Sequence, residues 1–196
     1  MARFSEIRKL MPGGGYTVDI PLGMLEGWVK SQSEDYVVDL DPDFQRGHVW
    51  SDEQRSRYVE FLLRGGNSQL TLYWNHPAYA NSSAPHCDLP NRLVLVDGKQ
   101  RLTACLKFMR DEIPVFGHYL REFDDPVDRR CGIGMVGARL KMNVNNLQTR
   151  RELLQWYIDL NDGGVVHAPE EIQRVRELLR LENSGEALAA TQVVRG

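Results

Sequence analysis

Two spacings of apolar residues recur along the chain and predict an alternation of short strands and helices. Runs of β-branched and aromatic residues bounded by turn residues predict strands. These runs lie at residues 16–20, 36–40, 70–74, 93–96, 113–116 and 140–144. Apolar residues three and four positions apart predict helices at residues 22–30, 52–64, 99–110, 149–162 and from Pro169 onward. The pattern predicts an α+β domain whose helical C-terminal part, from about residue 149, packs on the sheet.

Turn residues and polarity divide the chain into a lead-in, one domain and a tail. Residues 1–15 end in a Pro- and Gly-rich stretch that predicts a flexible lead-in, and residues 183–196 are polar and alanine-rich, as in a frayed tail. Residues 16–182 carry the periodic pattern, and a chain of 196 residues suits one domain with its own core. Residues 75–91 join two predicted strands as an extended hairpin. This connection is longer than most, which makes it a candidate lid.

The composition is that of an ordinary globular protein, with 42% hydrophobic residues, 26% charged residues and a net charge of −3. No apolar run approaches the roughly 20 residues that cross a membrane, and the N-terminus lacks the apolar core of a signal peptide. We therefore expect a cytoplasmic protein with no membrane partner. The slightly acidic total also argues against a protein that holds nucleic acid by bulk charge.

Positive charge is concentrated in the middle of the chain. Residues 99–151 hold 11 basic and 6 acidic residues, whereas residues 1–98 and 152–196 each have a net charge of −4. This excess predicts a basic face that contacts DNA. Its residues would be Arg129, Arg130, Arg139, Lys141, Arg150 and Arg151. The alternative, that they pair with the acidic cluster at residues 124–128 or only solvate the surface, stays open.

The cysteines and histidines show no spacing typical of a metal site. Cys87, Cys105 and Cys131 are far apart and form no CxxC pair, so we expect ordinary reduced thiols. Cys105 falls on the apolar side of a predicted helix, which indicates a place in the core. The five histidines lack HxH, HExxH and HNH-type spacing, and none is assigned as a metal ligand.

The most informative stretch is a strand that turns directly into a helix at Asp97-Gly98. The unpaired N–H groups and the dipole at such a helix start favour a bound anion. Lys99 and Arg101 place cations in the first turn, where acids are usual, and a bound phosphate would explain them. An ordinary Asp-Gly turn with solvated basic residues is the alternative.

A second loop, Phe44-Gln45-Arg46, lies between a predicted strand and a predicted helix. Ser51 and Gln54 form a capping-box pattern at the start of that helix, and Gly65-Gly66 ends it. A loop in this position suits a polar group that reaches a ligand. The guanidinium fork of Arg46 matches phosphate oxygens.

These segments, in this order, resemble the DGQQR-motif family. Phe44-Gln45-Arg46 is followed by Trp50, Gly65-Gly66 and then Asp97-Gly98-Lys99-Gln100-Arg101-Leu102-Thr103-Ala104. Residues 156–164, with Glu170-Glu171 after them, resemble the later Phe-x-x-Ile-Asn-x-Gly-Gly…Glu block of the family. The family forms the N-terminal domain of GmrSD-type modification-dependent restriction enzymes and is similar to the ParB/sulfiredoxin superfamily. Two features depart from the pattern: Lys99 stands in place of the first Gln of DGQQR, and the printed sequence ends before a nuclease domain.

The resemblance implies a ParB/sulfiredoxin-like mixed sheet and a nucleotide site. The chain has no Walker P-loop and no dinucleotide-binding glycine pattern, so the phosphates would be held as in that superfamily. The implied binding residues are Gln45, Arg46, Gly65, Gly66, Gly98, Lys99 and Thr103, and the implied ligand is ATP, GTP or CTP with Mg²⁺. No cysteine lies in the 97–101 loop, so sulfiredoxin-type repair of peroxiredoxins is not expected.

Asp97, Gln100 and Arg101 are the candidate catalytic residues. Asp97 would hold Mg²⁺ or position a water, and the alternative is a turn-forming Asp bonded to the backbone ahead. Arg101 would neutralise the charge that builds during phosphoryl transfer, and the alternative is a pairing with a nearby carboxylate.

Three further polar residues are candidate members of the site. His48 is close in sequence to Arg46 and would reach the same pocket. Glu60 is a candidate base, although it also suits a helix-stabilising pair with Arg64. Asn161 would anchor the ligand, as the family block implies, or cap the end of its helix.

Three hypotheses for function follow. The first is an enzyme that binds a nucleoside triphosphate with Mg²⁺ and hydrolyses its terminal phosphate or transfers it to a hydroxyl, such as one on modified DNA. Its setting would be DNA modification, restriction or phage–host conflict in a bacterial or phage-infected cell. The second is a nucleotide-regulated DNA-binding module that works with a separate nuclease partner. The third is a ParB-like nuclease, which the lack of an HNH or PD-type constellation makes the weakest.

Overall fold

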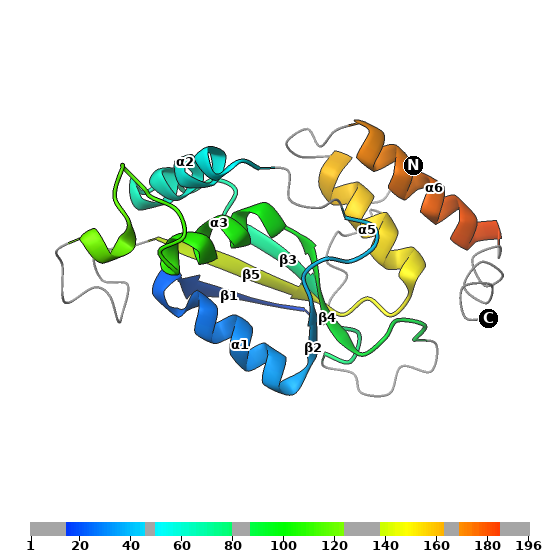
Figure 1. Ribbon diagram of the computed structural model, residues 1–196. Helices are drawn as coiled ribbons and strands as arrows, with labels where there is room; N and C mark the ends of the chain where they lie inside the picture. The colour runs from blue at the N-terminus through cyan, green and yellow to red at the C-terminus, as the bar shows by residue number, and fades with distance from the viewer. Residues whose placement is uncertain (1–14, 46–49, 80–86, 124–137, 163–168, 185–196) are drawn as a thin grey trace, which may run out of the picture.

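A five-stranded mixed sheet forms the centre of the computed structural model, which describes residues 15–45, 50–79, 87–123, 138–162 and 169–184 (Figure 1). The strands are β1 (Tyr16–Pro21), β2 (Val37–Asp39), β3 (Thr71–Asn75), β4 (Arg92–Asp97) and β5 (Arg139–Asn145). They lie in the order β1-β5-β3-β4-β2. Strands β1–β5 and β3–β4 pair antiparallel, whereas β3–β5 and β2–β4 pair parallel. The predicted α+β class with a mixed sheet is therefore confirmed.

The helices follow the predicted order. They are α1 (Leu25–Asp35, preceded by a 3-10 turn at Leu22–Met24), α2 (Asp52–Leu63), α3 (Lys99–Met109), α5 (Arg150–Asp162) and α6 (Pro169–Ser184), with a second 3-10 turn at Leu120–Glu122. Among the residues described, no helix combines the length and apolar character that crossing a bilayer requires.

The capping box predicted at Ser51 is confirmed, and the start of α5 has a second one. The Ser51 hydroxyl accepts from the Gln54 N–H at 3.2 Å, while the Gln54 side chain accepts from the Ser51 N–H at 2.8 Å. Thr149 and Glu152 exchange the same pair of bonds at the start of α5. Each reciprocal pair satisfies two of the N–H groups that a helix start leaves open.

One predicted strand, residues 113–116, is wrong. Ile113 and Val115 are fully buried, so their alternation reports burial correctly, but the chain turns back at once. Phe116 (φ 52°) and Gly117 (φ 80°) both adopt positive φ, and Val115 and His118 exchange backbone hydrogen bonds across this two-residue turn. The segment is a tight hairpin turn and contributes no strand to the sheet.

The two faces of the sheet bury two separate cores. Alternate strand residues such as Leu72, Trp74 and Leu95 pack with side chains of α1, α2 and α3, where Cys105 is also buried, as predicted. Val94 and Val96 point the other way and pack with α5 and α6. In Figure 1, α5 and α6 lie side by side at the end of the molecule away from α2. Because β4 is buried on both faces, its C-terminal end is held firmly where the site begins.

Some predictions fall on residues that the structure does not describe. They are the lead-in up to residue 14, the middle of the candidate lid at 80–86 and the tail from residue 185. Asn183 and Ser184, predicted to belong to the tail, are the last residues of α6. The antiparallel pairing of β3 with β4 confirms that residues 75–91 join two neighbouring strands.

Candidate functional site

The corner between β4 and α3 is built around Gly98. Strand β4 ends at Asp97, Gly98 adopts φ 105°, and α3 begins at Lys99. A Cβ on Gly98 would lie 2.3 Å from the side chain and 3.3 Å from the Cα of Leu72, so both the backbone angle and the space require glycine. The first intrahelical bond runs from the Leu102 N–H to the Gly98 carbonyl at 2.9 Å. No side chain caps this helix and no acid lies in its first turn, which leaves its N-terminus attractive to an anion.

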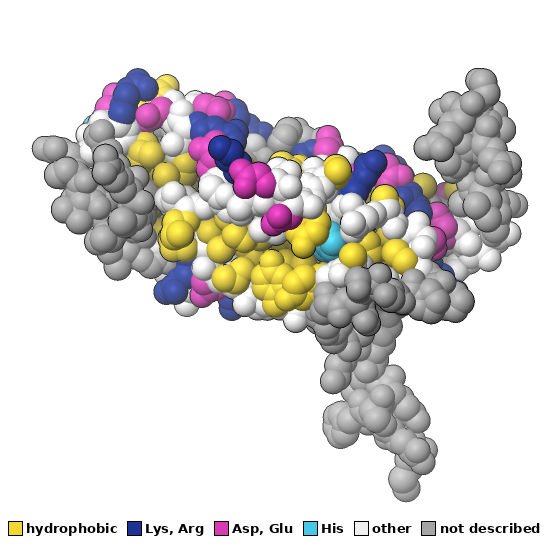
Figure 2. All heavy atoms as spheres, turned by 90° about the horizontal axis from the view of Figure 1, so that it is seen from below, with side chains coloured by type: hydrophobic (Ala, Val, Ile, Leu, Met, Phe, Trp, Pro, Cys, Tyr) yellow, Lys and Arg dark blue, Asp and Glu magenta, His cyan; other side chains and the backbone are white. Residues whose placement is uncertain are grey.

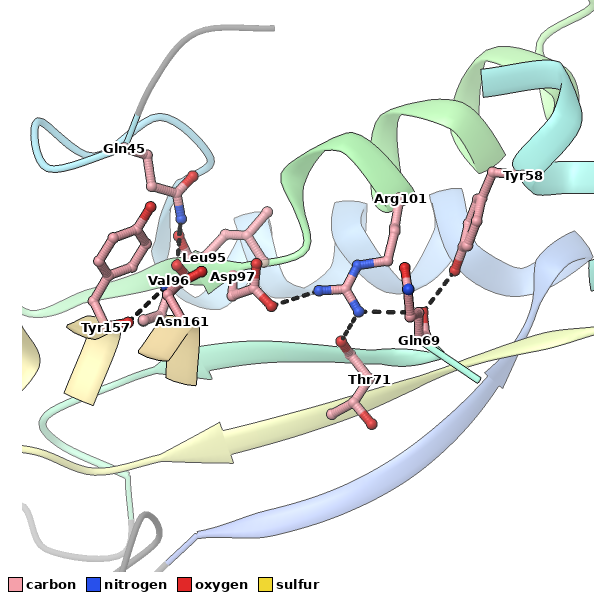
Figure 3. A network of polar contacts seen from close by, with 10 residues as sticks. All are labelled: Gln45, Tyr58, Gln69, Thr71, Leu95, Val96, Asp97, Arg101, Tyr157 and Asn161. Carbon is pink, nitrogen blue, oxygen red and sulfur yellow. Dashed lines mark hydrogen bonds and ion pairs between the residues drawn. The ribbon is translucent and has the colours of Figure 1, made fainter. Parts of the chain in front are cut away.

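Arg101 is bonded to three groups of the protein itself (Figure 3). Its Nη2 donates to Asp97 Oδ2 at 2.5 Å, and its Nη1 donates to the carbonyls of Thr71 at 2.7 Å and Gln69 at 3.1 Å. The Tyr58 hydroxyl also donates to the Gln69 carbonyl, at 2.9 Å. Arg101 therefore ties the first turn of α3 to the start of β3, and the alternative pairing with a carboxylate is the one the structure shows.

A β-bulge sets the position of Asp97. The β3–β4 register pairs Trp74 with Leu95 but Tyr73 with Asp97, so Val96 is an extra residue in β4. This brings the Asp97 carboxylate near the Tyr73 phenol. Burial raises the pKa of Tyr73, and the charge of Asp97 raises it further. Tyr73 was not among the predicted site residues, because only the bulged register places it beside Asp97.

The other basic residue of the motif, Lys99, reaches the preceding loop. Its Nζ lies 2.5 Å from Asp41 Oδ1, and the Lys99 side chain is only 9% exposed whereas that of Asp41 is 67% exposed. Gln100 Oε1 accepts at 3.3 Å from the N–H of Trp50, the first residue after 46–49 in the sequence. The first turn of α3 therefore contacts both flanks of the 41–50 loop, which brings together the two segments that the sequence predicted to share a site.

Gln45 fixes the near flank of this loop to β4. Its Nε2 donates to the carbonyls of Leu95 at 2.5 Å and Val96 at 2.6 Å, at the bulge (Figure 3). The Gln45 side chain, predicted to bind phosphate, thus holds the loop to the backbone of β4. The predicted Arg46 and His48 lie outside the described residues.

Gly65 and Gly66 terminate α2. The Gly65 N–H donates to the Leu62 carbonyl at 3.0 Å and the Gly66 N–H to the Phe61 carbonyl at 2.9 Å, with Gly65 at φ 83°. These are the paired bonds that close a helix C-terminus. In the turn that was predicted to bind phosphate, both glycine amides are therefore engaged in closing α2.

The remaining candidates have local partners. Glu60 Oε1 accepts from the Phe116 N–H at 2.8 Å and so supports the 115–118 turn, and no ion pair between Glu60 and Arg64 is formed among the described residues. The buried Asn161 donates to the Tyr157 carbonyl at 2.6 Å, one turn earlier in α5 (Figure 3). Thr103 is half-buried in α3.

A divalent metal would find one carboxylate in this corner. Among the described residues, no three His, Cys, Asp or Glu side chains gather as a metal site. Asp97 gives one oxygen to Arg101, which leaves Oδ1 for a ligand. This donor set fits Mg²⁺ only if nucleotide phosphates supply most of its ligands, as is common for Mg²⁺.

Of the basic residues predicted to bind DNA, two form ion pairs within the protein, two are exposed and two lie outside the described residues. Arg139 lies 3.6 Å from Asp19, and Arg150 pairs with Asp43 at 2.6 Å and Glu182 at 2.9 Å. Lys141 on β5 and Arg151 on α5 are exposed, and Arg129 and Arg130 lie outside the described part of the chain.

The family described as GmrSD restriction endonuclease, N-terminal domain, matches residues 25–131. The chain belongs to this family. The match includes both loops of the candidate site, from Asp41 to Gln45 and from Asp97 to Arg101, and it confirms the resemblance seen in the motifs. No curated protein and no solved structure matches the chain.

Membership of the GmrSD family places the chain in the context of DNA restriction. The matched segment holds α1, α2 and α3 and strands β2, β3 and β4. Strands β1 and β5, which complete the sheet, and helices α5 and α6, which build the second core, lie outside it.

Proposed function

We propose that the chain binds a nucleoside triphosphate (ATP, GTP or CTP) with Mg²⁺ at the N-terminus of α3 and hydrolyses or transfers its terminal phosphate during DNA restriction. The observation that carries the proposal is the start of α3, which has no side-chain cap and no acid but has Lys99 and the Gly98 turn. Such a start combines amides that take no part in the intrahelical ladder, the positive end of a helix dipole and a cation in one place.

Each residue of the corner has a separate role in this proposal. The amides at the start of α3 hold phosphate oxygens, and Lys99 adds its charge by moving from the exposed Asp41 to the phosphates. Asp97 Oδ1 orients the attacking water or hydroxyl beside the phosphates. Mg²⁺, where bound, would neutralise phosphate charge. Arg101 holds the Asp97 carboxylate in place through Oδ2, which makes it a positioning residue.

A second function, a nucleotide-regulated DNA-binding module with a separate nuclease partner, is favoured by one observation. The guanidinium of Arg101 already serves Asp97 and two carbonyls, so it is less able to stabilise a phosphoryl-transfer transition state. Such a module would bind nucleotide without turnover and change its affinity for DNA. Among the described residues, no three His, Cys, Asp or Glu side chains gather as a metal site, so no observation favours the third function, a ParB-like nuclease.

Phosphate release and transfer from labelled ATP, GTP and CTP, with and without plain or hydroxymethylated DNA, tests the proposal. Asp97→Asn keeps an acceptor for Arg101 and should abolish turnover while nucleotide still binds. Lys99→Met should weaken nucleotide binding. Arg57→Ala, which breaks an exposed pair with Glu53 on α2, is the matched control and should behave as wild type.

Three outcomes of this assay have distinct meanings. Turnover that Asp97→Asn removes supports the enzyme. Nucleotide-dependent DNA binding without turnover supports the regulatory module. Wild-type protein that binds no triphosphate contradicts both functions.

A further inference from the structure

Helix α6 holds the loop that leads into the candidate site. Arg174 Nη2 donates to the carbonyls of Asp43 at 2.9 Å and Gln45 at 3.1 Å. The side chain of Arg174 belongs to a helix outside the family match, and its acceptors lie inside it. Because both acceptors are backbone atoms, the contact fixes the path of the chain rather than one side chain.

Helix α5 holds the same segment through Arg150. Its Nη1 and Nη2 lie 3.3 Å and 2.6 Å from the two carboxylate oxygens of Asp43, a bidentate pair. Its Nε lies 2.9 Å from Glu182 on α6. Burial lowers the pKa of Arg150, but the hydrogen bonds and charges of Asp43 and Glu182 outweigh burial and raise it. Arg150 therefore joins α5, α6 and residue 43.

The held segment is in turn joined to the end of β4. Phe44 is 1% exposed and packs edge-on against Tyr157 of α5, with ring centroids 5.3 Å apart. Gln45 donates to Leu95 and Val96, the two residues before Asp97. A continuous set of contacts thus runs from α6 through residues 43–45 to the β4–α3 corner.

We propose that Arg174 and Arg150 are positioning residues for the nucleotide site: they fix residues 43–45, which set the bulged end of β4 and the place of Asp41 beside Lys99. This inference rests on the proposed function. It assigns to Arg150 of α5 and Arg174 of α6 a part in building the corner formed by residues 41–45 and 97–101, which lie in other elements of the chain. It also predicts that a change in the packing of α6 alters nucleotide affinity.

A purely structural role for the two arginines predicts something different. They would then stabilise the packing of α5 and α6, and their loss would lower the melting temperature without any specific effect on residues 43–45 or on nucleotide. The two roles separate when local opening and nucleotide affinity are measured beside global stability.

Amide hydrogen exchange on the full chain measures local opening without nucleotide. Arg174→Ala should speed exchange of the Gln45 N–H, which is bonded to the Pro42 carbonyl at 3.0 Å, and of amides 95–97. The melting temperature should fall by only about 2–4 °C, since the lost bonds are exposed. Arg174→Lys retains one donor and should restore most of the protection.

Nucleotide binding is measured on the same proteins with ATP, GTP and CTP. Arg174→Ala and Arg150→Ala should weaken binding about threefold to tenfold, the range of a modest coupling between sites. If the wild type turns over, KM should rise more than kcat falls. Arg110→Ala is the matched control, because it breaks a 2.7 Å surface pair with Glu26 that joins the far end of α3 to α1.

The outcomes are distinguishable. Faster exchange at residues 43–45 with weaker nucleotide binding, in the two variants and not in the control, supports the inference. Unchanged exchange in Arg174→Ala overturns the contact set, whether or not nucleotide binds. Faster exchange with unchanged affinity overturns the link to the site. If the wild type binds no nucleotide, the proposed function fails, and the link to the site fails with it, while exchange still decides whether α6 holds the loop.

Discussion

The carboxylate of Asp97 and the guanidinium of Arg101 lie 2.5 Å apart across the start of α3, and each is less than one-fifth exposed. Arg101 also bridges to the carbonyls of Thr71 and Gln69, so it closes the corner where β4, α3 and the start of β3 meet. The acid and the base of the family motif are therefore partners of one another. In this arrangement the motif shapes the turn as much as it presents charges to a ligand.

This relationship predicts that Arg101 and Asp97 differ in their effect on stability. Arg101→Ala leaves two carbonyls and a carboxylate without their donor in a partly buried corner, and should lower the free energy of unfolding by about 2–3 kcal/mol. Asp97→Asn still offers Arg101 an acceptor and should cost about 1 kcal/mol or less. Urea denaturation of both variants measures the difference. Equal losses would mean that the carbonyl bonds of Arg101 contribute nothing.

Glycine substitutions test the geometry of the corner. In Gly98→Ala the new Cβ would lie 2.3 Å from the Leu72 side chain, and alanine would have to adopt φ 105°. The substitution should therefore destabilise the fold by about 3 kcal/mol or more. Gly65→Ala, at φ 83° with open space around it, should cost only about 1 kcal/mol. Gly27→Ala inside α1 has open space and helical backbone, and should stabilise by about 0.5–1 kcal/mol. The melting temperatures from thermal unfolding should increase in the order Gly98→Ala, Gly65→Ala, Gly27→Ala.

Local signals in the sequence predicted most of the fold. Ser51 with Gln54 and Thr149 with Glu152 mark helix starts because each reciprocal bond needs only residues three apart. The strand predicted at residues 113–116 is wrong because alternation is also a local signal. It shows that side chains are buried, but it does not show whether a partner strand exists.

Long-range partners explain what the sequence could not predict about the site. The motif at residues 97–101 can be recognised in the sequence, but Arg101 bonds to the backbone carbonyls of Gln69 and Thr71. Because every residue has such a carbonyl, the residue types do not indicate these acceptors. Arg174 is separated from its acceptors by about 130 positions, and only the packing of α6 brings them together. The contact of Arg174 with residues 43–45 therefore could not be predicted from the sequence.

Lys99 offers a second test of the anion site. Lys99→Gln creates the Asp-Gly-Gln-Gln-Arg sequence of the family motif and removes the ion pair with Asp41. Because Asp41 is 67% exposed, this loss should cost less than about 1 kcal/mol of stability. Nucleotide affinity should decrease in the order wild type, Lys99→Gln, Lys99→Met, since glutamine keeps a donor but not the charge. The salt dependence of binding should weaken in both variants, and affinities that are equal in all three would show that Lys99 does not contact phosphate.

His76 predicts how stability changes with pH. His76 is 4% exposed, its ring centroid lies 4.1 Å from that of Tyr36 with the two rings tilted by 57°, and neither ring nitrogen has a hydrogen-bond partner among the described residues. Burial lowers the pKa of His76 below its ordinary value of 6.5, so the folded protein holds the neutral ring while the unfolded chain binds a proton near that value.

The unfolded state then binds more protons below pH 6.5, which means that the stabilisation is complete above this pH and is lost as pH falls toward the lowered folded pKa. We expect the free energy of unfolding from urea titrations to decrease between pH 7 and pH 5. His76→Phe, which does not titrate, should flatten this slope. An identical slope in the wild type and His76→Phe would show that His76 is protonated in the folded protein as readily as in the unfolded chain.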